Sequence, residues 1–147
     1  EGRLEPFDLR KVAEAIAVVR DAVRAGTLRS AHDVSDGGLA VALAECAMEA
    51  NLGASVVLAP GLRPSALLFG ETTGRVLVTF SAGERGPVES AAQAAGVPME
   101  VIGRVEGERL EVRAGDGPPL LDEPVAELHR IWTSSIARAN EEAAEVL

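Results

Sequence analysis

A polar segment that runs through two adjacent glycines into an apolar stretch is the feature that most constrains this chain. Residues 30–45 read SAHDVSDGGLAVALAE, so carboxylates and hydroxyls precede Gly37 and Gly38, and a run rich in Ala and Leu follows them. Glycine has no Cβ, so the backbone here can adopt positive φ angles and approach a ligand or another strand closely. The pattern predicts a polar turn that opens a nearly buried helix.

The side chains of this turn are suited to capping a helix or to binding a ligand. Ser35 and Asp36 are good N-cap residues, because a side-chain oxygen can accept a hydrogen bond from a backbone N–H of the first turn. The positive end of the helix dipole favours an anion there, but Asp33 and Asp36 would repel a bare phosphate unless a divalent cation lay between them. The local chemistry leaves open ribose hydroxyls, a metal-bridged phosphate or capping alone. It makes Asp33 and Asp36 candidate metal ligands without predicting a resident metal.

A second polar patch precedes a predicted strand. Residues 68–78 read LFGETTGRVLV, and a loop in front of a strand can face a ligand. The alternative is a structural role, which is also our interpretation of His32 beside Asp33. The candidate ligand-binding or domain-interface residues are therefore Asp33, Ser35, Asp36, Gly37, Gly38, Glu71 and Thr72.

Composition limits the class of protein. The chain has 147 residues, 47% of them hydrophobic but only 3% aromatic, which predicts a single domain over residues 1–147 with a core of Ala, Val and Leu. The net charge of −9 argues against nonspecific binding of nucleic acid. Cys46 is the single cysteine, so no intramolecular disulfide can form, and we expect a reducing cytoplasm. No apolar run approaches the ~20 residues of a membrane span.

Hydrophobic periodicity predicts alternating helices and strands. A first helix ends at Gly26 and carries Val12, Ile16, Val19 and Val23 on its apolar face. A final helix begins at Pro124, with Leu128, Ile131, Trp132 and Ile136 on its inner side, and residues 1–7 and 141–147 are expected to fray. The other predicted elements are strands at 30–34, 54–58 and 75–80, helices at 39–49 and 88–95, and a hairpin of 99–105 with 109–113, followed by a loop at 115–119.

This order of elements predicts an α/β fold of the α+β type, in which helices cover a mixed β-sheet. Strands 54–58 and 75–80 are expected to lie centrally in the sheet, because both are continuous β-prone runs. The predicted hairpin requires antiparallel neighbours, which argues against a purely parallel, doubly wound sheet.

The strings AHDVSDGGLAVALAE and LFGETTGRVLV together closely resemble the C-terminal domain of phosphoribosylformylglycinamidine synthases (the PurL subunits), within the aminoimidazole ribonucleotide synthetase-like superfamily. The resemblance implies the C-terminal-domain fold of that superfamily. It also implies that a chain starting at Glu1 without Met is the excised last domain of a larger synthase. The family's N-terminal copy of the domain carries Glu-Ser-Gln at the second patch. Here Glu71 matches, whereas Thr72 and Thr73 depart.

The resemblance further implies a function in purine biosynthesis. The complete enzyme would be an ATP-dependent C–N ligase that converts formylglycinamide ribonucleotide and ammonia into formylglycinamidine ribonucleotide. ATP and Mg²⁺ would be held mainly by the preceding domains, so no catalytic residue is assigned to this chain, and the isolated domain is expected to be inactive and to self-associate. Expected partners are the preceding domains, a glutaminase subunit and a small helper subunit. The alternative is a standalone phosphometabolite-binding or regulatory module.

Overall fold

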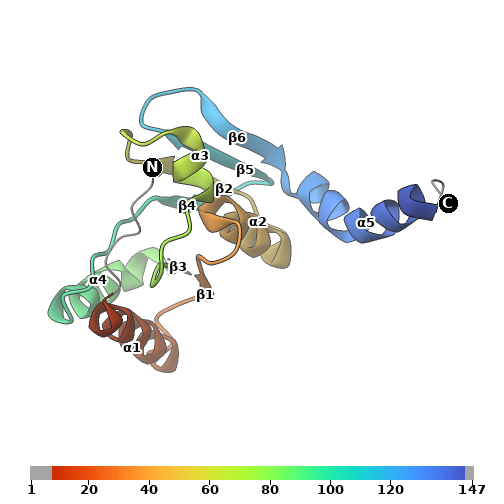
Figure 1. Ribbon diagram of the computed structural model, residues 1–147. Coiled ribbons are helices and arrows are strands. Elements are labelled where there is room, and N and C mark those ends of the chain that lie inside the picture. Colours follow the sequence, from red (N-terminus) through yellow and green to blue (C-terminus); the bar gives the residue numbers. More distant parts are fainter. Residues whose placement is uncertain (1–7, 145–147) are drawn as a thin grey trace. The chain divides into compact units, whose positions relative to one another are not determined.

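The computed structural model describes residues 8–144, which form mixed α/β structure (Figure 1). The chain divides into two compact units, one of residues 1–43 and 65–101 and the other of residues 44–64 and 102–147. This division does not test the prediction that residues 1–147 form a single domain, which stays a prediction. Residues 1–7 and 145–147 lie outside the described part, and residues 141–144 continue the last helix.

The first unit begins with helix α1, Leu9–Ala25. The Oδ1 atom of Asp8 accepts a hydrogen bond from the backbone N–H of Arg10 at 3.0 Å, and Gly26 ends the helix in the left-handed conformation. The predicted helix is confirmed, but its predicted apolar face is partly wrong: the side chains of Ile16 and Val23 are 56% and 54% exposed. The helix instead buries the small residue Ala22, and it packs beside α4 (Arg85–Ala94).

Strands β1 (Ser30–Asp33) and β3 (Val76–Thr79) form an antiparallel two-stranded sheet in the same unit. The prediction that strand 75–80 lies centrally in a sheet is wrong, because among the described residues β3 has β1 as its one neighbour. The register pairs Asp33 with Val76. The carboxyl end of β1 therefore lies beside the amino end of β3, and the polar segments that follow and precede them are brought to one edge.

Helix α2 (Gly38–Ala50) matches the predicted helix 39–49, and Leu39, Ala42 and Leu43 are buried as expected. The short helix α3 (Pro64–Phe69) is not among the elements that the sequence predicts. Proline is tolerated at the first position of a helix, where its missing N–H has no intrahelical partner. Helix α4, which confirms the helix predicted at 88–95, follows the 3₁₀ turn η1 (Ala82–Glu84) and buries Val88 and Ala92.

The second unit contains a mixed four-stranded sheet in the order β4-β2-β5-β6. Strand β2 is antiparallel to β4 and parallel to β5, and β5 is antiparallel to β6. Leu110 and Val112 of β5 are 0% exposed and form the centre of this unit's core. The strands are β2 (Ala54–Leu58), β4 (Gly103–Val105), β5 (Arg109–Ala114) and β6 (Pro119–Pro124).

The predicted hairpin of 99–105 with 109–113 is wrong, since β2 lies between β4 and β5. Gly53 lies beneath the connecting turn: its N–H donates to the carbonyl of Gly107 at 2.8 Å, and its carbonyl accepts from the N–H of Glu106 at 3.0 Å. A Cβ atom on Gly53 would lie 2.3 Å from the carbonyl oxygen of Arg109. The glycine thus lets a short turn pass over the end of β2.

The real hairpin of this unit joins β5 to β6 around residues 115–118, where the sequence predicted only a loop. Helix α5 (Val125–Ala144) follows β6 directly. Its predicted inner side is partly wrong, because Ile131 and Trp132 are 52% and 57% exposed, and the side chain of Ile136 lies outside the described residues. Within residues 8–144, every helix falls short of the length or apolarity needed to cross a bilayer.

Candidate functional site

The two polar patches singled out in the sequence meet in the structure. The antiparallel pairing of β1 with β3 places residues 34–37, after β1, beside residues 70–75, before β3. The backbone N–H of Val34 donates to the carbonyl of Arg75 at 3.0 Å, and the N–H of Gly37 donates to Oε1 of Glu71 at 2.9 Å. We call this pair of segments, residues 33–38 and 70–75, the two-patch site.

Both glycines of the turn are required by its geometry. Gly37 and Gly38 have φ angles of +82° and +70°, a region that residues with a Cβ rarely adopt. A Cβ on Gly38 would lie 2.7 Å from the carbonyl carbon of Phe69, so the start of α2 lies against the backbone of the second patch. The diglycine therefore serves both the turn and the close contact between the patches.

The start of α2 differs from the capping predicted for Ser35 and Asp36. The helix begins at Gly38, so Gly37 occupies the position immediately before it, and Ser35 contributes its backbone carbonyl, which accepts from the N–H of Gly38 at 3.0 Å. The carboxylate of Glu71 takes the place that a capping side chain or a bound anion would occupy. A negative charge at this end of a helix is stabilised by the free N–H groups and the dipole.

The two-patch site is exposed and rich in carboxylates. The exposed residues of the site include Asp33, Ser35, Asp36, Glu71 and Thr72. A hydrogen bond from the Ser35 side chain lowers the pKa of Asp33, and a backbone hydrogen bond and the nearby imidazole of His32 act in the same direction. With Glu71 at the helix start, the site is suited to accept hydrogen bonds from hydroxyl or amino groups rather than to bind a bare phosphate.

His32 lies at the edge of the two-patch site. Its Nδ1 atom is 2.7 Å from the carbonyl oxygen of Asp33 and 4.0 Å from Oδ1 of the same residue. One ring nitrogen is thus engaged by the local backbone, which supports the structural role inferred for this residue from the sequence.

In the described part of the chain, no third metal-binding side chain lies beside the candidate metal ligands Asp33 and Asp36. Among the described residues, no group of three or more His, Cys, Asp or Glu side chains is placed to hold a metal ion. A magnesium ion held by one or two carboxylates would need its other ligands from water or from a substrate phosphate. The residues present therefore do not form a metal site of their own.

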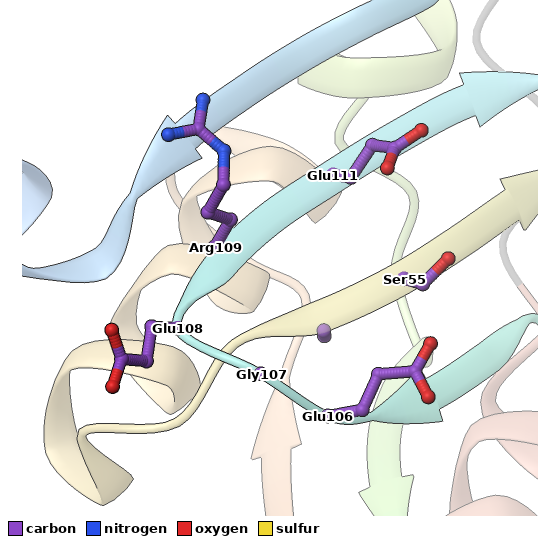
Figure 2. Close-up of a pocket in the computed structure, with 7 residues that line it drawn as sticks. Ser55, Glu106, Gly107, Glu108, Arg109 and Glu111 are labelled. Carbon is purple, nitrogen blue, oxygen red and sulfur yellow. The ribbon is translucent and has the colours of Figure 1, made fainter.

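A separate pocket of about 270 Å³ lies on the second unit (Figure 2). Figure 2 shows Ser55 on β2 and Glu111 on β5, with Glu106 directly after β4. Arg109, the one basic residue in the lining, is engaged by Asp122, whose Oδ1 is 2.7 Å from its Nε. Glu111 is paired with Arg113. Apart from a Gly-containing turn, no signal in the sequence pointed to this pocket, and two of its charged groups, Arg109 and Glu111, form ion pairs within the sheet.

The comparisons with known proteins agree with the resemblance seen in the sequence. The family model described as "AIR synthase related protein, C-terminal domain" matches residues 4–115. The PurL subunit of phosphoribosylformylglycinamidine synthase from Moorella thermoacetica is 41% identical over 135 residues, which cover 92% of this chain and 18% of that protein.

Solved structures share the fold. Phosphoribosylformylglycinamidine synthase II from Thermotoga maritima superposes with a TM-score of 0.74 at 24% identity, over 84% of this chain and 22% of that chain. T. maritima PurL complexed with ATP superposes with a TM-score of 0.70 at 24% identity, over 79% of this chain and 21% of that one. This chain spans about a fifth of the length of each of these relatives.

Proposed function

The chain belongs to the AIR synthase related protein, C-terminal domain family, and from this membership we propose that it serves as the C-terminal domain of a PurL-type phosphoribosylformylglycinamidine synthase. The main support is the 41% identity to a PurL subunit over 92% of the chain. The hydrogen bond between Gly37 and Glu71 adds to it, because it joins the two segments on which the resemblance was based.

The activity belongs to the whole synthase, which we propose to be an ATP-dependent C–N ligase. It would convert formylglycinamide ribonucleotide and ammonia into formylglycinamidine ribonucleotide, with ADP and phosphate as the other products. When bound, ATP supplies the phosphoryl group that activates the formamide oxygen, and Mg²⁺ neutralises charge on that group. We assign these ligands mainly to the preceding domains, as the resemblance of the two patches to PurL subunits implies.

This chain would contribute the two-patch site, either to the rim of a nucleotide site or to a contact with a preceding domain. Glu71, held at the start of α2, and the exposed carboxylates of Asp33 and Asp36 would accept hydrogen bonds from ribose hydroxyls or from a neighbouring backbone. Gly37 and Gly38 would keep the turn in the conformation that presents these carboxylates. No catalytic residue is assigned to this chain, and alone it is expected to be inactive.

The partners and location that follow from the proposal are those of such a synthase. They are the preceding domains, a glutaminase subunit that supplies ammonia and a small helper subunit, all in the cytoplasm. The relative from M. thermoacetica is itself named as a subunit, which supports assembly into a larger enzyme.

A chimera tests the proposal. In the M. thermoacetica PurL polypeptide, the segment that aligns with this chain is replaced by residues 1–147, and formation of formylglycinamidine ribonucleotide is measured with ammonia and ATP. We expect turnover by the chimera and none by this chain alone. A soluble, folded chimera without turnover would contradict the proposal. Micromolar binding of ATP and Mg²⁺ by this chain alone in calorimetry would favour the standalone ligand-binding module instead.

A further inference from the structure

Helix α5 carries one apolar stripe that is buried at its start and exposed further along. Val125 is 2% exposed, and its backbone N–H donates to the carbonyl of Glu108 at 3.0 Å, which fixes the first turn to the second unit. Leu128 is half-buried, whereas Ile131 and Trp132 are 52% and 57% exposed. Residues 125, 128 and 132 share one face of a helix, with 131 beside them. The apolar side chains of this face are thus buried in the first turn and exposed in the turns that follow.

Polar side chains in the described part of this helix form hydrogen bonds within the helix. Arg130, on the opposite side from Trp132, pairs with Glu127, with Nε and Oε2 at 2.8 Å. The hydroxyl of Thr133 donates to the carbonyl of His129 at 2.9 Å. An exposed Trp beside an exposed Ile, with polar side chains such as His129 and Ser135 around them, has the composition of the centre of an interface with its rim.

The length of the PurL relative indicates which polypeptide covers Ile131 and Trp132. The family model ends at residue 115, before β6 and α5, whereas the PurL relative aligns over 92% of the chain. The part of that relative outside the alignment is about four-fifths of its length. We propose that Ile131 and Trp132 dock onto an apolar surface in that remaining part of the synthase polypeptide, so that α5 ties this domain to its neighbours. This inference rests on the proposed function.

Trp132 itself reports the contact, because the chain has one Trp and no Tyr. The probe is the M. thermoacetica PurL polypeptide from which the aligned segment is deleted, with its own Trp residues replaced by Phe. Addition of this probe to residues 1–147 is expected to shift the emission of Trp132 to shorter wavelengths in a saturable way. Absence of a shift and of heat in calorimetry would overturn the inference.

Substitutions on the two sides of α5 test whether binding depends on Ile131 and Trp132. Trp132→Ala and Ile131→Ala are each expected to raise the Kd measured by calorimetry at least about tenfold, the range of an interface hot spot. Arg130→Ala, on the opposite side, is expected to change it less than about twofold. Because Trp132 and Ile131 are exposed, circular dichroism should show that both variants remain folded. Equal Kd values for all four proteins would overturn the inference.

Other occupants give different results. A blue-shifted emission of Trp132 in the chain alone at high dilution would mean that the chain covers its own helix, and a shift that grows with concentration would mean a second copy. Either result overturns the inference. The synthase chimera distinguishes this from failure of the proposed function: an active chimera whose Trp132→Ala variant is equally active and equally stable overturns the docking role alone, whereas an inactive chimera overturns the proposed function.

Discussion

The N–H of Gly37 lies 2.9 Å from Oε1 of Glu71, and this hydrogen bond joins two segments that are 34 residues apart in the chain. It places a carboxylate of the protein at the amino end of α2, where free N–H groups and the helix dipole favour negative charge. The amino end of this helix thus has a carboxylate from within the chain beside it. A second negative charge, such as that of a free phosphate, would be repelled by this carboxylate.

Replacement of Glu71 by Ala should lower the free energy of unfolding by about 0.5–1 kcal/mol, since it removes an exposed, charge-assisted hydrogen bond at a helix terminus. Glu71→Gln should lose less, because the amide oxygen can still accept the bond. Urea denaturation measures both, with Glu100→Ala as the control, an exposed carboxylate away from any helix start. Equal stability of wild type and Glu71→Ala would show that the hydrogen bond contributes nothing.

Replacement of Gly38 by Ala should be more costly than the same change at Gly96. Both have positive φ, +70° and +67°, so both pay about 1–2 kcal/mol of backbone strain. A Cβ at residue 38 would lie 2.7 Å from Phe69 C, whereas nothing lies within 4 Å of one at residue 96. The crowding should add about 1–3 kcal/mol in thermal or urea unfolding. A similar loss at both positions would mean that the two patches separate easily.

Local sequence signals predicted much of this fold. The end of α1 at Gly26 and the strand at 54–58 were predicted correctly, because a helix stop signal and a continuous β-prone run depend on neighbouring residues. The prediction of a hairpin was wrong because the short turn at 106–108 has the length of a β-hairpin loop. In the structure this turn passes over Gly53, which lies more than fifty positions earlier in the chain. Strand order is set by such distant packing, which periodicity in one segment cannot reveal.

The sequence singled out the two patches but did not predict the contact between them, and the role of their residues in binding stays a prediction. The two patches were identified separately, and the sequence did not show that Glu71 would cap the turn before α2. That contact depends on the register between Asp33 and Val76, which two short strands do not determine by themselves. The exposure of Trp132 was missed for a related reason: an apolar stripe indicates that a helix face is covered, but not whether its own chain covers it.

Truncation of Val112 to Ala should destabilise the second unit strongly. The side chain is 0% exposed at the centre of the four-stranded sheet, so removal of two methyl groups leaves a cavity and should cost about 2–4 kcal/mol in urea denaturation. Val57→Ala is the matched control, because Val57 lies on the neighbouring strand and is 47% exposed. It should cost less than about 1 kcal/mol. Comparable losses at the two positions would contradict the assignment of this core.

Removal of the Ser35 hydroxyl should raise the pKa of Asp33 towards its ordinary value of 3.8, since the hydrogen bond from Ser35 is the main cause that lowers it. A lowered pKa in the folded state means that the carboxylate contributes stability above the unfolded pKa, and that this contribution is lost as pH falls through the folded value. The relevant window is therefore below about pH 4. Carboxyl-carbon NMR titration of wild type and Ser35→Ala measures the shift, with Thr72→Ala as a control in the neighbouring patch. An unchanged Asp33 titration in Ser35→Ala would show that the hydroxyl does not hold this carboxylate.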